Sequence, residues 1–298
     1  MSQCLLTVTC DRDRWSFIHQ YYSVNKYIKP CTWYIVINEL EEKSWLKFFK
    51  KHKEDSPHDI KLIPLQKYLW PLHPDSQKFI KSKPGYWRQL YCKLLIHLHC
   101  KEKRIVVLDS KNWIAKKCKL SDFPQQRLKS RDQTVFRGTI EFFQKFWKID
   151  TPFVTDNITP YILYKKTLAS MWKEFHDVDA GIGYLKNKKF ISKKTKLPQQ
   201  SGYLAEFFMY DIFCQKKGLH QHIVRDGKYP DPELYAWFDP SKFENKDDFI
   251  KQVEFKNSRV PPLSITVKWY VENEGGSLNQ NHRKLLISTI MKEKVNAN

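Results

Sequence analysis

Residues 104–112 read RIVVLDSKN and contain the most strand-like segment of the chain, Arg104–Leu108, which ends on Asp109. The strongest predicted helix, Tyr86–His99, precedes it, and its apolar residues recur at helical spacing. A buried strand that follows an amphipathic helix is typical of a sheet whose neighbouring strands run parallel. This stretch therefore predicts an α/β fold with a carboxylate at the end of a central strand.

The same alternation of strands and helices extends back to the N-terminus. We expect strands at Cys4–Thr9, Thr32–Ile37 and Asp59–Pro64, with helices at Asp13–Ile28 and Glu39–His52 between them. This order predicts a mostly parallel central sheet flanked by helices on both faces. Ligands of such sheets bind outside the carboxyl ends of the strands, so we expect Asp11 and Asp109 at the binding edge.

The second half of the chain is less regular. Thr159–Phe175 and Gly202–Lys217 predict amphipathic helices, and Gly218 is expected to cap the second one. The segment Lys186–Lys196 holds six Lys and no acid. It is interpreted either as a solvated loop or as a lid over an anionic ligand.

Composition limits the class of protein. The formal net charge is +20, from 52 Lys and Arg of which only ten are Arg, and apolar residues make up 41 % of the chain. An excess of Lys predicts first a solvated surface, with attraction to an anionic small molecule or polymer as alternatives. The seven cysteines contain no CxxC pair, which predicts free thiols. The sequence also shows no signal peptide and no long apolar stretch, so we expect a cytoplasmic location.

Several common catalytic motifs are missing from the sequence. It contains no GxxxxGK[ST], GxGxxG, GxSxG or HExxH pattern, and the histidine pairs His97/His99 and His220/His222 indicate a metal site only weakly. The strand end at Asp109 remains. A carboxylate there either caps the following turn or, with a second oxygen ligand, binds Mg²⁺ or Mn²⁺ and through it a diphosphate.

Four sequence features occur in an order that resembles a known family. They are Leu6–Thr9 with Asp11, then Gly85-Tyr86-Trp87-Arg88-Gln89 with Lys93-Leu94, then Leu108-Asp109-Ser110, and finally Ser201 with Glu206-Phe207-Phe208-Met209-Tyr210. Together they resemble the GT-A glycosyltransferase fold over roughly residues 4 to 215. More narrowly, they resemble a bacterial and phage family of predicted glycosyltransferases, in which a Gly-Trp-Trp-x-Gln-Gln-x-x-Lys-Leu helix precedes a Leu-Asp-Ser-Asp strand end.

The resemblance implies a transferase that moves a sugar from a nucleotide-sugar donor to the hydroxyl of a glycan or other acceptor. It implies one GT-A-like domain over residues 1–298, with a nucleotide-sugar-binding half at 1–125 and an acceptor half with a C-terminal extension at 126–298. The implied catalytic residues are Asp109, Lys111 and Glu206, the last as a base or orienting group for the acceptor. The implied donor-binding residues are Thr9, Asp11, Trp87, Arg88, Gln89, Lys93 and Ser110.

The chain departs from the resembled strand end at one position, where Lys111 replaces the second aspartate. Either Asp109 and Asn112 bind Mn²⁺ or Mg²⁺ weakly, or the ammonium of Lys111 faces the diphosphate and partly replaces the cation. A catalytically inactive GT-A-like binding module and a basic nucleic-acid-binding protein are the alternative functions. The bias toward Lys over Arg counts against nucleic acid.

Overall fold

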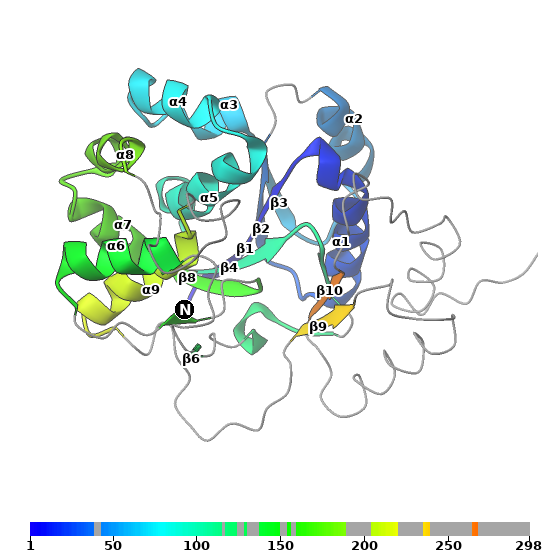
Figure 1. Cartoon of the computed structure of the whole chain (residues 1–298). Helices are drawn as coiled ribbons and strands as arrows, with labels where there is room; N and C mark the ends of the chain where they lie inside the picture. Colours follow the sequence, from blue (N-terminus) through cyan, green and yellow to red (C-terminus); the bar gives the residue numbers. More distant parts are fainter. Residues whose placement is uncertain are drawn as a thin grey trace, which may run out of the picture.

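A five-stranded sheet forms the centre of the protein in the computed structural model (Figure 1). Its strands stand in the order β3 (Asp59–Pro64), β2 (Thr32–Ile37), β1 (Gln3–Thr9), β4 (Arg104–Asp109) and β8 (Tyr161–Tyr164). The first four are parallel to their neighbours, and β8 is antiparallel to β4. The predicted α/β fold with a mostly parallel sheet is thus confirmed. The structure describes residues 1–38, 43–114, 117–123, 128–129, 137–149, 154–155, 159–188, 204–219, 235–238 and 264–267.

The register of the sheet aligns the ends of its central strands. Val8 of β1 pairs with Asp109 of β4, and Thr9 pairs with Ile37 of β2. The carboxyl ends of β1, β2 and β4 therefore meet at one edge. Both faces of these strands are buried, which explains why β4 is a continuous apolar run and not an alternating one.

Helices cover both faces of the sheet (Figure 1). One face packs on α1 (Arg14–Tyr27) and α2 (Lys43–His52), with a short 3₁₀ turn at Asp11–Asp13 before α1. The helices on the other face are α3 (Leu65–Tyr68), α4 (Pro74–Lys81), α5 (Gly85–Leu95), α6 (Arg137–Trp147), α7 (Lys165–Lys173), α8 (Val178–Lys186) and α9 (Glu206–Lys216). Successive residues of β4 point to opposite faces, so Val107 packs with the α5 side and Leu108 with the α1 side.

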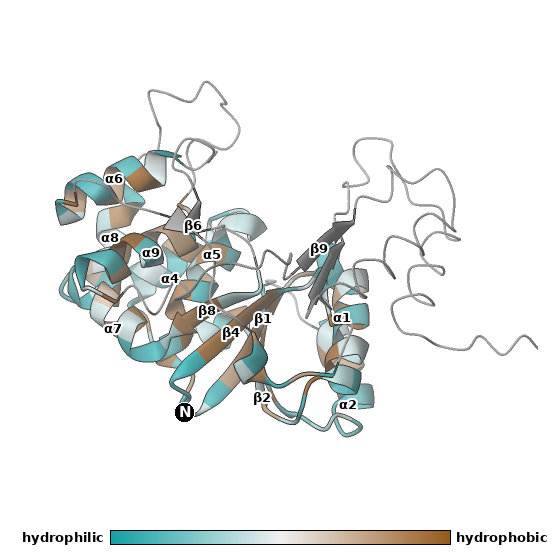
Figure 2. Cartoon of the chain, turned by 90° about the horizontal axis from the view of Figure 1, so that it is seen from below, coloured by the Kyte–Doolittle hydropathy of each residue, from teal (hydrophilic) through white to brown (hydrophobic). Residues whose placement is uncertain are grey.

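Short elements complete the described part of the chain. Two further 3₁₀ turns lie at Ile96–Leu98 and Leu120–Asp122. A small sheet has the order β5 (Asn112–Trp113), β10 (Ser264–Val267) and β9 (Tyr235–Phe238), and β6 (Leu128–Lys129) pairs with β7 (Val154–Thr155). Hydrophobic residues lie along β1 and β4, as the colouring of Figure 2 shows.

Helix α5 brings two polar residues to the end of β4. Its inner side is fixed by burial of Leu90, Leu94 and Leu95, each of which stabilises the fold by roughly 1.5–3 kcal/mol. Gln89 and Lys93 are four residues apart and therefore lie on one side of this helix. The buried leucines thus set the direction in which the two polar side chains point.

The structure corrects the expected helix at Thr159–Phe175. Its first part is strand β8, in which Leu163 pairs with Ile105 of β4, and α7 begins only at Lys165. The segment Tyr161–Tyr164 is rich in aromatic and β-branched residues, and pairing with the edge of β4 outweighs its helical periodicity. β8 lies C-terminal to residue 125, where we expected the first half of the domain to end, yet it belongs to the same sheet as β1 to β4.

Other predicted elements differ mainly in their ends. Helices α4, α6 and α8 were not predicted. Gly218 does cap α9, with a φ of 66° and with the N–H of Leu219 donating to the carbonyl of Cys214 at 2.8 Å. The seven cysteines are free thiols, as expected. In the part of the chain that the structure describes, no helix is long and apolar enough to cross a membrane.

Candidate active site

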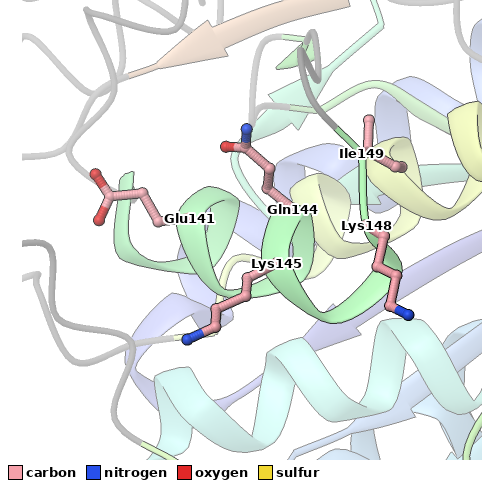
Figure 3. A pocket seen from close by; sticks show the side chains of 5 residues that line it. All are labelled: Glu141, Gln144, Lys145, Lys148 and Ile149. Carbon is pink, nitrogen blue, oxygen red and sulfur yellow. The ribbon is translucent and has the colours of Figure 1, made fainter.

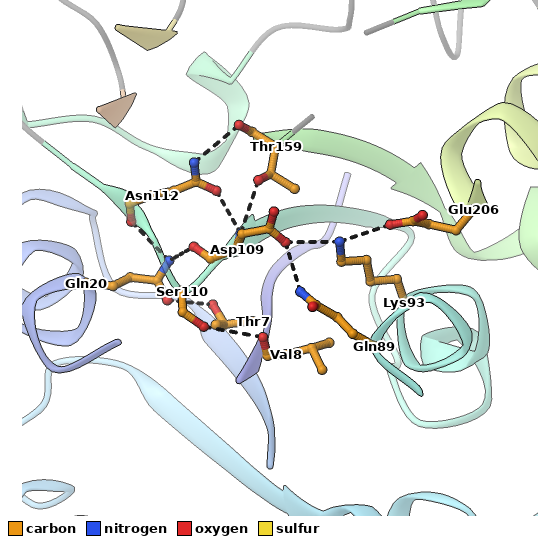
Figure 4. Close-up of polar contacts among 10 residues, drawn as sticks. All are labelled: Thr7, Val8, Gln20, Gln89, Lys93, Asp109, Ser110, Asn112, Thr159 and Glu206. Carbon is orange, nitrogen blue, oxygen red and sulfur yellow. Dashed lines mark hydrogen bonds and ion pairs between the residues drawn. The ribbon is translucent and has the colours of Figure 1, made fainter. Parts of the chain in front are cut away.

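Asp109 is the last residue of β4, and its backbone is held from three directions (Figure 4). Its N–H donates to Asn112 Oδ1 at 2.7 Å and to Thr159 Oγ1 at 3.3 Å. Its carbonyl oxygen accepts from Gln20 Nε2 at 2.6 Å. These contacts fix the turn after β4, so the carboxylate of Asp109 is presented in a defined direction toward α5.

The side chain of Lys93 lies between two carboxylates. Its Nζ is 3.0 Å from Asp109 Oδ1 and 2.9 Å from Glu206 Oε1. Gln89 Nε2 donates to the same Asp109 oxygen at 3.1 Å. We call Gln89, Lys93, Asp109 and Glu206 the Lys93 network; Figure 4 shows that it joins α5, β4 and α9.

Charge and burial act in opposite directions in this network. Burial favours the neutral amine, but Asp109 and Glu206 outweigh it and raise the pKa of Lys93. Burial would raise the pKa of Asp109, yet the positive charges of Lys93 and Lys111, together with hydrogen bonds from Lys93 and Thr159, hold this pKa below its ordinary value. At neutral pH the network therefore contains a buried ammonium and an ionised Asp109.

Glu206 lies deeper than the resemblance implied. Its side chain is 2 % exposed, and burial raises its pKa, an effect that Lys93 only partly offsets. Among the residues that the structure describes, its Oε2 has no hydrogen-bond partner. This burial does not fit the expected direct contact with an acceptor hydroxyl, because an acceptor would have to reach behind Lys93.

Two expected donor-binding residues lie beside Asp109. Ser110 is buried, and its hydroxyl donates to the carbonyl of Val8 at 3.4 Å, which ties the β4 turn to β1. Thr9 is also buried at the end of β1, and its hydroxyl has no partner within the described residues. Both side chains therefore line the protein side of the sheet edge and are not exposed.

The remaining donor-binding candidates do not join the Lys93 network. Asp11 is exposed and forms an ion pair with Arg14 at 2.7 Å. Arg88 donates from Nε to Asn38 Oδ1 at 3.1 Å, at the end of β2. Trp87 is half-buried and its ring lies 5.5 Å from the ammonium of Lys83. Asp11 and Arg88 belong to the same edge of the sheet as Asp109, but each has its own partner.

The expected metal-ligand pair does not fit a divalent cation. Asn112 is fully buried; its Oδ1 accepts the N–H of Asp109, and its Nδ2 donates to the carbonyl of Thr159 at 3.3 Å. Asp109 Oδ1 is shared by Lys93 and Gln89. No group of three or more His, Cys, Asp or Glu that could hold a metal ion occurs in the described ranges. The amide of Asn112 is a structural group of the β4 turn, which corrects the expectation of an Asp109–Asn112 ligand pair.

The histidine pair at positions 97 and 99 is not a metal site either. His97 Nδ1 lies 3.1 Å from the carbonyl of Leu94, whereas His99 Nε2 lies 2.8 Å from the carbonyl of Tyr68. Each ring is thus used by a different backbone group. His220, His222, Ser201 and most of the lysine-rich segment 186–196 lie outside the described residues.

Two residues of the site were not predicted from the sequence. Gln20 of α1 donates to the carbonyls of Asp109 and Asn112 and accepts from Thr7 Oγ1 at 3.0 Å. Thr159 bonds to both Asp109 and Asn112. Gln20 has a detectable signal, because it lies three residues after Phe17 on the buried side of its helix, where a polar residue needs a partner.

A small surface hollow of about 280 Å³ lies along α6, and no residue of the Lys93 network lines it (Figure 3). It is lined by Glu141, Gln144, Lys145, Lys148 and Ile149. Its side chains carry charges of both signs and include none of the residues nominated by the sequence. The hollow therefore adds nothing to the candidate site.

Comparisons with known proteins give weak likenesses. No protein-family model matches the chain, and no curated protein matches it. Mouse xyloside xylosyltransferase 1 aligns with a TM-score of 0.48 and 11 % identity, over 91 % of this chain and 96 % of its own. The bifunctional glycosyltransferase WbbM aligns with a TM-score of 0.47 and 13 % identity, over 89 % of this chain and 45 % of its own. The galactosyltransferase LgtC aligns with a TM-score of 0.47 and 9 % identity, over 99 % of this chain and 98 % of its own. At TM-scores this low the alignments support no functional inference, so the function is argued from the site.

Proposed function

We propose that the protein is a glycosyltransferase that moves a sugar from a nucleotide-sugar donor to an acceptor hydroxyl at the carboxyl edge of its sheet. The observation that carries this proposal is the Lys93 network. Gln89, Lys93, Asp109 and Glu206 come from three separate motifs of the sequence, and Lys93 and Glu206 are 113 positions apart, yet their side chains meet at the end of β4. A network of buried charges at the carboxyl end of a central parallel strand is the arrangement expected of a ligand site, and this supports the proposal.

The proposed reaction exchanges one bond for another at the anomeric carbon of the donor sugar. The bond from this carbon to the diphosphate oxygen breaks, and the electron pair leaves with the nucleoside diphosphate. A bond from the same carbon to the acceptor oxygen forms, and the acceptor proton passes to solvent. The protein must therefore position the donor and stabilise the charge on the departing diphosphate.

Asp109 is proposed to orient the donor. Its side chain is 19 % exposed at the sheet edge, and its carboxylate is ionised. A fixed carboxylate of this kind accepts hydrogen bonds from sugar hydroxyls. Gln89 and Lys93 hold one of its oxygens, which keeps the carboxylate in one orientation. Glu206 is proposed as a positioning residue, because it acts on Asp109 through Lys93.

A thermal-shift panel of UDP-, GDP-, CMP- and dTDP-sugars tests this proposal. We expect at least one of the sugars linked to a nucleoside diphosphate, which are the UDP-, GDP- and dTDP-sugars, to raise the melting temperature of the wild type and to have a much smaller effect on Asp109→Ala; the CMP-sugar serves as a monophosphate comparison. Asp59→Ala is the matched control, because Asp59 is an exposed carboxylate at the opposite, amino-terminal end of β3. If no nucleotide-sugar stabilises the wild type at saturating concentration, the proposed function is wrong.

The contacts of the arginines support nucleic-acid binding less well than they support glycosyl transfer. The five in the described part of the chain, Arg12, Arg14, Arg88, Arg104 and Arg137, all contact protein groups. Arg104 is buried and donates to the carbonyls of Leu120 and Phe123. An arginine held in this way is not presented for bidentate contacts with bases or phosphates. A salt titration of DNA and RNA binding measures any remaining affinity of the lysine surface.

A further inference from the structure

Lys111 stands two residues after Asp109, where the resembled strand end has its second aspartate. Its side chain is exposed, and its positive charge contributes to holding the pKa of Asp109 below its ordinary value. Lys111 lies in the turn between β4 and β5, two residues from Asp109, and its side chain is exposed to solvent. An exposed ammonium at the edge where ligands bind is available to an anionic ligand.

The carboxylate of Asp109 is already paired with the ammonium of Lys93. Lys93 Nζ lies 3.0 Å from Asp109 Oδ1, and it is anchored on its other side by Glu206 at 2.9 Å. The Lys93 side chain is only 5 % exposed, and moving it away would leave the buried Glu206 without its cation. A divalent cation bound to Asp109 would be repelled by this fixed ammonium.

A second oxygen ligand is also not available beside Asp109. The buried amide of Asn112 accepts the N–H of Asp109 and donates to the carbonyl of Thr159. Turning its oxygen toward a metal would break the contact that shapes the β4 turn. Mg²⁺ and Mn²⁺ need several oxygen ligands in a regular geometry. The described residues contain no group of three or more His, Cys, Asp or Glu that could hold a metal ion, and Asp11 at the same edge is paired with Arg14.

We propose that the diphosphate of the nucleotide-sugar is neutralised by the ammonium of Lys111 and not by a divalent cation. This inference rests on the proposed function and specifies how the site meets the charge of the leaving group. Lys111 replaces a metal-binding carboxylate by a positive charge, so the chain itself supplies what the cation supplies in a two-carboxylate site. Lys93 keeps Asp109 ionised and oriented for the donor, while Lys111 contacts the phosphate oxygens.

Calorimetric titration with UDP, GDP, CDP and dTDP tests the inference. Each nucleotide is titrated once in excess EDTA and once in excess Mn²⁺. We expect the wild type to bind at least one of them with the same affinity in both buffers. Lys111→Gln should weaken this binding about tenfold in both, which corresponds to one lost charge-assisted hydrogen bond.

Two variants control for charge and folding. Lys111→Arg retains the positive charge and should bind nucleotide in EDTA nearly as well as the wild type. Lys103→Gln removes the same charge from an exposed lysine at the amino-terminal end of β4 and should leave binding unchanged. Circular dichroism checks that all variants are folded.

Three outcomes would overturn the inference, and one of them also overturns the proposed function. Wild-type binding that requires Mn²⁺, or equal binding by Lys111→Gln and the wild type in EDTA, disproves the role of Lys111 but leaves nucleotide binding itself, and with it the proposed function, standing. If the wild type binds no nucleotide in either buffer, the proposed function fails and this inference fails with it.

Discussion

Replacing Lys93 by methionine tests whether the Lys93 network is an ion-pair network. The substitution removes the ammonium but keeps a side chain of similar length. It leaves Glu206, which is 2 % exposed, without a cation and removes the ammonium that bridges Glu206 and Asp109 at 2.9–3.0 Å. Loss of one partner from a buried ion pair costs about 3–5 kcal/mol. Since whole domains are stable by only about 5–15 kcal/mol, Lys93→Met should lose a large part of the free energy of unfolding.

The pH dependence of this variant follows from Glu206. Burial raises the pKa of Glu206 above its unfolded value, and removal of Lys93 takes away the main effect that lowers it. A folded state that binds the proton more tightly than the unfolded state is stabilised by acid, and this stability is lost as the pH rises through the folded pKa. Lys93→Met should therefore become more stable, relative to the wild type, when the pH is lowered from about 8 to about 5.

Urea unfolding followed by tryptophan fluorescence measures both effects. The double variant Lys93→Met/Glu206→Gln is the control, because it removes the ionisable group that Lys93 compensates. We expect it to be more stable than Lys93→Met alone at neutral pH. If Lys93→Met unfolds at the wild-type urea concentration, or if the added Glu206→Gln change brings no recovery, the network does not hold buried charges and the reasoning is wrong.

Further predictions concern packing and charge. Gly181→Ala should destabilise the protein by about 1–3 kcal/mol in urea unfolding, because the new Cβ would lie 2.7 Å from the ring of Trp172. Gly183→Ala in the same helix meets no atom within 4 Å and should stabilise it by about 0.5–1 kcal/mol; equal effects of the two would contradict the packing of α8. Arg104→Met should cost several kcal/mol, of the order expected when two buried carbonyls lose a charged donor, and an unchanged thermal midpoint would contradict its buried position. The pKa of Asp109 is held below 3.8, so its charge stabilises the folded state above that value, and this stability is lost as the pH falls through the folded pKa. Asp109 therefore stays ionised near neutral pH, and nucleotide binding should not depend on its titration there. A binding midpoint near pH 6 that vanishes in Asp109→Asn would contradict this.

The sheet could be predicted from the sequence because its strands are buried on both faces. The apolar runs at β1, β2 and β4 and the leucine spacing of α5 are local patterns that the fold preserves. β8 was predicted as a helix, since its assignment depends on an antiparallel partner that the local sequence does not show. Tertiary pairing decides the structure of such short segments.

The site was only partly predictable for the same reason. The rule that ligands bind at the carboxyl ends of parallel strands places Asp109 at the edge. It does not reveal that Lys93 bridges Asp109 to Glu206, because that contact depends on how α5 and α9 pack. Nor does residue spacing indicate that the amide of Asn112 is hydrogen-bonded to the backbone of Asp109 and Thr159.

A crystal structure with the nucleotide-sugar that stabilises the protein tests the central claim most directly. The account predicts difference density at the carboxyl ends of β1 and β4, with the donor sugar beside Asp109 and the diphosphate within hydrogen-bond distance of Lys111 Nζ. Density at another position, such as the hollow along α6, with the Asp109 edge filled only by solvent, would contradict it.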